Sequence, residues 1–344
     1  MRKSLPPMDT SYEVFFKMPY EALKWELLKT ALEWKLFDRT SAGTSAAALS
    51  DALGLHPGNT TYLLNALVAL GLLTKKDGVY TNTARAERFL TTGKDTSLGE
   101  ALLFMAGWTT PLLNGGVQKL VENGPPPQDD LTDPAIWVQG ARVSLSHSRC
   151  ARAQYVARLV AELPEFPSFT RILDLGSGPG IIGIAVTAAH PSLKCVVFDQ
   201  PPVCTVAREA VVEYGMEERV AVQEGDYMSD DFGSGYDFVM ANYTLNFYRD
   251  RLADIMTKVL QALRPGGVFM VTSDGLNRDR TAPAGSIISW LPIQLQGNDM
   301  SFESGQIARA MREAGFVSTE MRVLTDVEVE AHGSVEMTLG RKKG

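Results

Sequence analysis

Cysteine is scarce in this sequence, and long apolar runs are absent. The three cysteines, Cys150, Cys195 and Cys204, show no C-x-x-C spacing, which excludes a disulfide framework and makes a reducing cytoplasm the expected location. No apolar run approaches the roughly 20 residues that a membrane span requires. The stretch 1–10 has two basic residues but no apolar core, so we expect no secretory signal there.

Positive charge is not in excess either. The chain has 33 Lys and Arg against 40 Asp and Glu, a net charge of −7, which argues against a general binder of nucleic-acid phosphates. Histidines, cysteines and carboxylates do not cluster at the spacing of metal ligands, so we expect no metal. With 344 residues, 45% of them apolar and 21% charged, the sequence is that of a globular protein with two domains.

The first 90 residues have the pattern of a winged helix. Apolar residues recur at helical spacing over residues 20–37, and shorter helices are expected over 46–53 and 59–70. Lys-Lys-Asp-Gly lies between two short β-like runs within residues 72–83, which indicates a hairpin. Helix, turn, helix and hairpin in this order make up a winged helix.

A winged helix often reads DNA, but this one lacks the side chains for it. The segment 57–71, at the position of a recognition helix, contains no Lys or Arg and presents an apolar face. A DNA reader needs cations and amides to reach phosphates and base edges. Residues 1–90 hold eleven Lys and Arg against nine Asp and Glu, a near-neutral balance. Packing or dimerisation is therefore the expected role.

The second half of the chain alternates between strands and helices. A mostly apolar helical region (91–121), a proline break (124–127) and a long helix (135–163) lead to it. Strands are expected at 171–175, 194–198, 220–224, 238–241 and 268–273, with helices between them at 181–189, 204–214 and 251–263 and another at 303–314. Such alternation predicts an open, mainly parallel sheet with helices on both faces. A final pair of strands is expected at 320–324 and 335–339.

The most informative segment joins the first of these strands to its helix. Gly176-x-Gly178-x-Gly180 follows the strand, Asp174 precedes the turn by two residues, and Asp199 ends the next strand. A carboxylate at Asp199 can accept both ribose hydroxyls of a nucleoside cofactor. Asp174 would repel the pyrophosphate of NAD but suits the ammonium group of S-adenosylmethionine. The D-x-G-x-G-x-G pattern is typical of class I methyltransferases, so the sequence favours S-adenosylmethionine over NAD.

Two later motifs agree with this interpretation. In Glu224-Gly-Asp-Tyr, the Asp226 carboxylate could accept the adenine amino hydrogens, while Tyr227 or Met228 covers the ring. The turn Leu-Arg-Pro-Gly-Gly before the strand at 268–273 is common in methyltransferases, and it is also a general turn signal. The cofactor-binding residues expected from the sequence are Asp174, Gly176, Gly178, Asp199, Gln200, Asp226, Tyr227 and Asn242.

A winged helix and a connecting helix are followed in order by the motifs DLGSGPG, FDQP, GDYM and LRPGG. In these features the sequence resembles the acetylserotonin and caffeate O-methyltransferase family over nearly its whole length. The resemblance implies S-adenosylmethionine as cofactor and a homodimer whose N-terminal domains interlock. It also implies an α/β fold: a Rossmann-like methyltransferase domain with a mixed, mainly parallel sheet, preceded by a mostly helical winged-helix dimerisation domain. The expected divisions are 1–121 for dimerisation, 122–166 as a helical connection and 167–344 for S-adenosylmethionine binding.

The sequence departs from this family at its catalytic base. In the family a histidine in an L-H-D-W segment deprotonates the acceptor hydroxyl, and Asn246 stands at that position here. A carboxamide does not accept protons usefully near neutral pH. Of the four histidines, His147 on the long helix is the candidate for a place in the pocket. Asn246 and His147 are therefore the two candidate catalytic residues.

A transfer that needs no base would account for Asn246. A thioether sulfur already carries its lone pair, so S-methylation needs only alignment and stabilisation of a sulfonium by aromatic faces. Bacterial relatives S-methylate 4-methylthio-2-hydroxybutyrate on the way to dimethylsulfoniopropionate, and this acceptor class, O-methylation with another base, C-methylation and a regulator without activity all stay open. The candidate acceptor residues are the aromatics Trp108, Tyr243, Phe247 and Trp290, with Arg142 and Arg149, and also Arg152, for a carboxylate.

Overall fold

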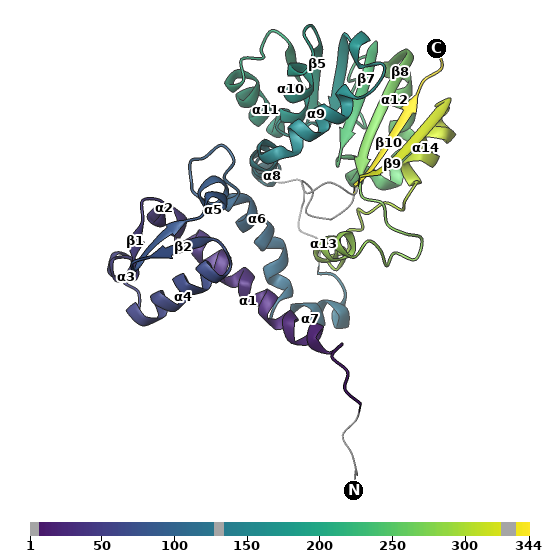
Figure 1. Ribbon diagram of the computed structural model, residues 1–344. Helices are drawn as coiled ribbons and strands as arrows, with labels where there is room; N and C mark the ends of the chain where they lie inside the picture. Colours follow the sequence, from purple (N-terminus) through teal and green to yellow (C-terminus); the bar gives the residue numbers. More distant parts are fainter. Residues whose placement is uncertain (1–6, 127–133, 325–334) are drawn as a thin grey trace. The chain divides into compact units, whose positions relative to one another are not determined.

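The computed structural model describes residues 7–126, 134–324 and 335–344. Contacts between residues divide the chain into two units, Met1–Ala106 and Gly107–Gly344 (Figure 1). The sequence-based divisions at residues 121 and 166 stay predictions. Within the described ranges, no helix combines the length and hydropathy that a membrane crossing requires.

The first unit has the predicted winged-helix order. Its elements are α1 (Glu13–Glu33), α2 (Leu36–Thr40), β1 (Thr44–Ser45), α3 (Ala46–Leu53), α4 (Pro57–Ala69), β2 (Leu73–Lys76), β3 (Val79–Asn82), α5 (Ala84–Phe89) and the start of α6 (Gly99–Thr109). The strands pair in the order β1-β3-β2. Asp77 and Gly78 both have positive φ, as the tight turn between β2 and β3 requires.

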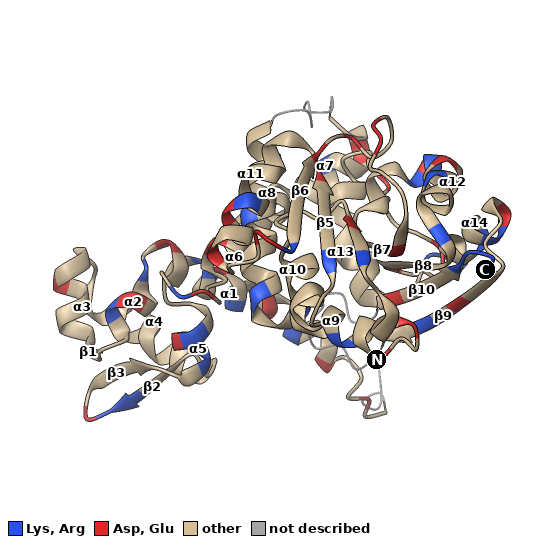
Figure 2. Ribbon diagram, turned by 90° about the horizontal axis from the view of Figure 1, so that it is seen from above, with Lys and Arg blue, Asp and Glu red and all other residues tan. Residues whose placement is uncertain are grey.

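Local capping sets the helix boundaries of this unit. The Ser45 side chain accepts a hydrogen bond from Ala48 N at the start of α3, and Gly54 ends that helix in the left-handed region. Pro57 occupies the first turn of α4, where its missing N–H costs nothing. The helix α4 carries no charged residue, and charges lie instead on β2 and α5 (Figure 2).

The second unit is built on a seven-stranded sheet in the order β6-β5-β4-β7-β8-β10-β9. The strands are β4 (Arg171–Leu175), β5 (Lys194–Asp199), β6 (Val220–Glu224), β7 (Tyr236–Asn242), β8 (Leu263–Ser273), β9 (Ser318–Leu324) and β10 (Val335–Arg341). The five strands from β6 to β8 are parallel, and β10 runs antiparallel to β8 and β9 on either side. The predicted mixed, mainly parallel sheet is thus confirmed, with its terminal strand pair.

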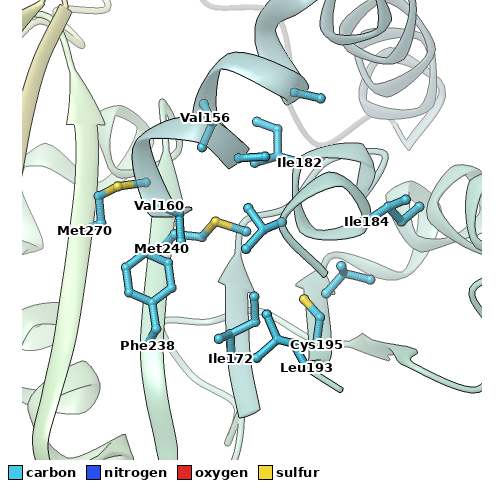
Figure 3. Packing of buried hydrophobic residues seen from close by; sticks show 14 of the residues in the cluster. Val156, Val160, Ile172, Ile182, Ile184, Leu193, Cys195, Phe238, Met240 and Met270 are labelled. Carbon is cyan, nitrogen blue, oxygen red and sulfur yellow. The ribbon is translucent and has the colours of Figure 1, made fainter. Parts of the chain in front are cut away.

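The central strands, such as β4 and β7, bury both of their faces, because their side chains alternate between two helical layers. Ile172, Phe238 and Met240 face a core completed by α9 and α10 (Figure 3). Leu173 and Val239, one residue along, face the core formed with α12 and α14. The helices are α7 (Gly116–Asn123), α8 (Pro134–His147), α9 (Ala153–Ala161), α10 (Ile181–Ala188), α11 (Pro201–Glu213), α12 (Leu252–Ala262), α13 (Ala284–Gln294) and α14 (Gln306–Ala314).

The predicted long helix before the sheet contains a change of helix type. The α8 helix passes into a π-helical turn over Ser148–Arg152 and continues as α9. A π-turn is wider than an α-turn and is found most often at functional sites. The turn therefore marks the part of this helix that faces the site described below.

Candidate functional site

The site lies where the order of the parallel strands reverses. The chain proceeds from β4 outward to β5 and β6, then returns to place β7 on the other side of β4. In open α/β sheets a crevice forms at this point, outside the carboxyl ends of the strands. A cavity of about 550 Å³ is found here, and its lining comes from the loops after β4, β5, β6 and β7 and from the helix containing the π-turn.

The glycine turn after β4 forms the floor of this cavity. Gly176, Gly178 and Gly180 all have φ between +56° and +71°, a region that favours glycine. A Cβ atom on Gly176 would lie 2.0 Å from Thr244 Oγ1, so only glycine allows the loop after β7 to pass this close. The helix α10 begins directly after this turn, and a backbone N–H group in its first turn lies close to Asp174.

Asp174 is buried beneath the turn, with 2% of its surface exposed. Its Oδ2 accepts a hydrogen bond of 2.9 Å from Gly183 N on α10. Burial raises the pKa of Asp174 to about 7; the Gly183 bond opposes the rise, and the nearby Asp199 carboxylate adds to it. A cation at this position would favour the ionised carboxylate.

Asp199, at the end of β5, is held in place by two backbone donors. Oδ2 accepts from Gly178 N and Oδ1 from Gln200 N, each over 2.7 Å. Burial raises the pKa of Asp199 to about 6, although both backbone bonds lower it. The carboxylate is thus fixed at the cavity wall, with lone pairs left to accept hydroxyl groups of a ligand.

Two tyrosines, Tyr227 and Tyr248, connect the loops after β6 and β7. The Tyr227 hydroxyl donates to the Thr244 carbonyl oxygen over 3.0 Å, and burial raises the pKa of this phenol. Tyr248 packs edge-on against the Tyr227 ring at 5.0 Å, and its hydroxyl donates to Asp226 Oδ1 over 3.3 Å. Asp226 Oδ1 also accepts a hydrogen bond from Met228 N, so the hydrogen bonds from Tyr248 and Met228 go to the same carboxylate oxygen.

Asn246 lies behind the cavity wall. Its Nδ2 donates to Asp274 Oδ1 over 3.0 Å and to the Met300 carbonyl oxygen over 2.8 Å. Burial raises the pKa of Asp274, although the bond from Asn246 lowers it. Asn246 therefore links the end of β8 to the loop that carries Met300 to the cavity.

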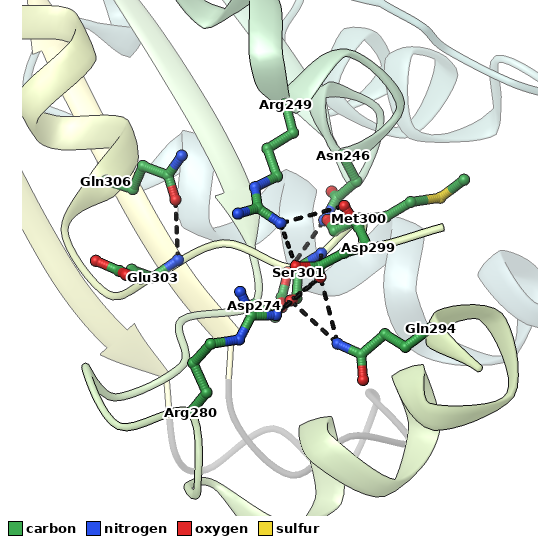
Figure 4. A network of polar contacts seen from close by, with 10 residues as sticks. All are labelled: Asn246, Arg249, Asp274, Arg280, Gln294, Asp299, Met300, Ser301, Glu303 and Gln306. Carbon is green, nitrogen blue, oxygen red and sulfur yellow. Dashed lines mark hydrogen bonds and ion pairs between the residues drawn. The ribbon is translucent and has the colours of Figure 1, made fainter. Parts of the chain in front are cut away.

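An ion cluster fixes this same loop from the other side (Figure 4). Asp299 accepts hydrogen bonds from Arg249 and Arg280, and Ser301 donates to it over 2.7 Å. Burial works against ionisation of Asp299, but the bonds from Arg280, Ser301 and Arg249 hold its pKa well below the usual range. The neighbours of Asp299 in sequence, Asn298 and Met300, both line the cavity.

Two buried polar atoms of the cavity lining have no protein partner among the described residues. They are Ser177 Oγ, in the glycine turn, and Asn242 Nδ2, at the end of β7. The charged lining residues that the structure describes are Asp174, Asp199 and Asp226 against Arg152. The cavity therefore fits a ligand that has positive charge and also brings hydrogen-bond acceptors.

The structure brings all eight sequence-predicted cofactor residues together. The lining contains Asp174, Gly176, Gly178, Asp199, Gln200, Asp226, Tyr227 and Asn242, together with the predicted acceptor residues Tyr243, Phe247 and Arg152. The other predicted residues lie outside it: His147 on α8, Asn246 behind the wall, Trp108 on α6 and Trp290 on α13. Arg142 and Arg149 form ion pairs with Glu209 and Glu213 of α11.

Several lining residues were not singled out from the sequence. Trp137, Ser144 and Ser148 come from the helix before the sheet, and Asn298 and Met300 come from the loop after α13. The four-residue spacing of Ser144, Ser148 and Arg152 is a helical signal that could have found the first group. No local sequence pattern identifies Asn298 and Met300. They are positioned by the ion cluster around Asp299, which joins distant parts of the chain.

Comparisons with known proteins agree with this geometry. A family model described as the O-methyltransferase domain matches residues 142–317, and one described as the O-methyltransferase dimerisation domain matches residues 21–92. The chain is 26% identical to 3-hydroxy-5-methyl-1-naphthoate 3-O-methyltransferase of Streptomyces sahachiroi over 91% of each protein. It is 28% identical to an N,N-dimethyltransferase of Streptomyces rimosus over 84% of this chain and 86% of the relative.

Solved structures show the same fold. Human N-acetylserotonin methyltransferase, solved in complex with S-adenosylmethionine, superimposes with a TM-score of 0.78 at 21% identity, covering 99% of this chain and 100% of that one. At this identity the likeness concerns the fold. It agrees with the strand order and with the helical first unit described above.

Proposed function

This chain belongs to the O-methyltransferase family, and we propose that it transfers a methyl group from S-adenosylmethionine to a small-molecule acceptor in the cavity at the end of β4 and β7. S-Adenosylmethionine supplies an electrophilic methyl group on a positively charged sulfur. The observation that carries the proposal is the pair of carboxylates, Asp174 and Asp199, fixed by backbone N–H groups around the glycine turn. Pyrophosphate, which NAD would bring, is disfavoured beside the buried Asp174 carboxyl group.

Each cofactor-side residue has a distinct task in this proposal. Asp199 accepts the ribose hydroxyls, and Asp174 attracts the ammonium group of the amino-acid tail. The glycine turn lets the donor approach the backbone closely. Asp226 accepts the adenine amino hydrogens, and the Tyr227–Tyr248 pair covers the adenine ring. Gln200, Ser177 and Asn242 provide further polar contacts at the cavity wall.

On the acceptor side, we propose that the transfer proceeds without a general base at Asn246. The amide donates to Asp274 and Met300, and its oxygen has no proton acceptor strength of use near neutral pH. What the cavity offers is alignment, plus the aromatic faces of Tyr243, Phe247 and Trp137, which can stabilise a sulfonium product.

Asn246 thus favours one second candidate function, the S-methylation of a thioether acid such as 4-methylthio-2-hydroxybutyrate. Ordinary O-methylation would need another base, and His147 is the histidine that the sequence offers near the cavity. A methyltransferase-like regulator that acts through DNA is disfavoured, because α4 lacks Lys and Arg.

We also propose that the chain acts as a homodimer in the cytoplasm. The dimerisation match covers residues 21–92 of the first unit. Just before this range, α1 exposes large apolar side chains, among them Phe15 at 68%, Phe16 at 69% and Tyr20 at 64%. Such a patch is typical of a surface that a partner covers. The three cysteines, all within the described residues, form no disulfide, and this is consistent with a reducing compartment.

The test of the proposed function has two steps. Isothermal titration first measures binding of S-adenosylmethionine and S-adenosylhomocysteine, and the absence of binding by both would refute the proposal. Labelled S-adenosylmethionine is then incubated with phenols, thioether acids and their oxygen analogues, and products are identified by mass. A labelled sulfonium supports base-free S-transfer, whereas methyl ethers as the main product would refute it and support an O-methyltransferase with another base.

A further inference from the structure

One face of the helix before the sheet is polar and points into the cavity. Ser144, Ser148 and Arg152 all line it, at intervals of four residues. Four residues exceed one turn of an α-helix, so such a series normally drifts around the helix. The wider π-turn over Ser148–Arg152 offsets this drift, because four residues complete less than one of its turns. The π-turn thereby keeps Arg152 on the cavity side.

The cavity lining also includes the amide of Asn242 at the end of β7. Thr272, which is 4% exposed on β8, donates from Oγ1 to Asn242 Oδ1 over 2.9 Å. In this arrangement the amide oxygen faces Thr272, and the Nδ2 donors point the other way. Nδ2 is buried and has no acceptor among the described residues. It is therefore a donor that an acceptor atom of a ligand in the cavity can satisfy.

The residue after Asn242 connects this donor to Arg152. The Arg152 guanidinium carbon lies over the ring of Tyr243, 5.0 Å from the ring centroid. Tyr243 N donates a hydrogen bond of 3.0 Å to the Thr272 carbonyl oxygen, which holds the ring's backbone in place. Thr272 therefore positions both the amide and the aromatic surface on which the guanidinium lies.

We propose that Arg152 and Asn242 form a carboxylate-binding site in the cavity. Arg152 is the positively charged residue among the described lining residues, and it is close enough to Asp174 to act on that carboxyl's pKa. Arg142 and Arg149, on the same helix, do not line the cavity and form ion pairs with glutamates of α11. A carboxylate provides the charge for Arg152 and the acceptor for Asn242 Nδ2 together.

The inference rests on the proposed function, which offers two sources of this carboxylate. One is the amino-acid tail of the methyl donor, whose ammonium group would then face Asp174 while its carboxylate faces Arg152. The other is an acidic acceptor, such as a thioether acid. Either carboxylate would make the same contacts with Arg152 and Asn242. The two possibilities predict different results when these residues are replaced: in the first case the methyl donor loses affinity, and in the second case the acceptor does.

The test compares ligands with and without the carboxylate. S-Adenosylhomocysteine and its decarboxylated analogue, S-adenosyl-3-thiopropylamine, are titrated into the native protein, Arg152→Gln and Asn242→Asp. Asn242→Asp keeps the acceptor for Thr272 but replaces the donor with a negative charge. If the donor is the source, both variants lose about 10- to 100-fold in affinity for S-adenosylhomocysteine. Their affinity for the decarboxylated analogue then stays within about threefold, and Arg152→Lys recovers part of the loss.

If the acceptor is the source, S-adenosylhomocysteine binds all variants equally. In its presence, 4-methylthio-2-hydroxybutyrate then binds the native protein more tightly than its carboxamide does, and Arg152→Gln and Asn242→Asp remove this difference. Arg158→Gln, which removes an exposed charge from α9, is the matched control and changes neither ligand's affinity. Equal effects on the acid and its uncharged counterpart, or no effect on either, would overturn the inference. Failure of the native protein to bind any nucleoside ligand would instead refute the proposed function.

Discussion

Asn246 donates from Nδ2 to Asp274 Oδ1 over 3.0 Å, and the two side chains are 3% and 1% exposed. The same nitrogen donates to the Met300 carbonyl oxygen. A buried carboxyl group is costly unless it accepts a hydrogen bond. The side-chain amide of Asn246 donates this hydrogen bond to Asp274 and adds no further charge. Asn246 therefore joins the end of β8 to the wall of the cavity.

Replacement of Asn246 separates this structural role from a chemical one. In Asn246→Ala, Asp274 loses its side-chain donor, and we expect a loss of about 1–3 kcal/mol in the free energy of unfolding. Turnover per folded molecule should stay within about tenfold, because no proton passes through the amide. Urea unfolding and initial rates with labelled donor measure the two quantities. His147→Ala is examined in parallel, and a loss of about a thousandfold in either folded variant would assign that side chain to the chemistry.

The pH dependence of donor binding follows from the two buried acids. The pKa of Asp174 is about 7 and that of Asp199 about 6 in the free protein. A cationic donor needs both groups ionised, so affinity should fall by up to about tenfold per pH unit between pH 7 and pH 6, and more steeply below pH 6, where the second group also becomes protonated. Titrations between pH 8 and pH 5.5 measure this, and a flat profile would contradict the assignment of Asp174 to the donor.

The stability of the free protein should depend on pH in the opposite sense. The folded-state pKa of Asp174 is raised above the ordinary value of 3.8, so the folded form binds the proton more tightly. Its contribution is fully present below pH 3.8 and is lost as the pH rises through about 7. Asp174→Asn removes this dependence. At pH 8 the free variant should be at least as stable as the native protein, while its donor affinity is lower.

Gly176 and Gly178 form a matched pair for the glycine turn. Both have positive φ, but a Cβ on Gly176 would meet Thr244 at 2.0 Å, whereas a Cβ on Gly178 meets nothing within 4 Å. Gly178→Ala should cost about 1 kcal/mol for its backbone conformation, and Gly176→Ala should cost about 1–3 kcal/mol more for the clash. Thermal unfolding compares them. Equal losses would show that Thr244 does not constrain the turn.

Asp299 should control the order of the loop that lines the acceptor side of the cavity. Asp299→Asn weakens the bonds to Arg249 and Arg280, and we expect faster hydrogen exchange over residues 297–303 by about tenfold or more. Exchange in α9 should not change. The removal of Asp254, an exposed partner of Arg251, serves as the control. Unchanged exchange in the loop after Asp299→Asn would contradict this role for the cluster.

The sequence allowed prediction of the elements and the cofactor side of the site, because both depend on local patterns. Alternating apolar runs and the glycine turn identified β4, and the parallel sheet then placed Asp174 and Asp199 at one edge. The acceptor side could not be derived in this way. Arg142, Arg149 and Arg152 look alike in the sequence, and only the packing of α8 on α11 and the π-turn separates them. The contact between Asn246 and Met300 spans 54 residues, which no local pattern reveals.

The central claim is that the turn between Asp174 and Gly180 binds the methyl donor, with Asp199 on its ribose. Titration of S-adenosylmethionine into the native protein, Asp199→Asn and Arg158→Gln measures this directly. We predict one donor per chain, no change for Arg158→Gln, and affinity about 10- to 100-fold weaker for Asp199→Asn, since an amide accepts the two hydroxyls less strongly than a carboxylate does. Undiminished binding by folded Asp199→Asn, or no binding by the native protein, would contradict the claim.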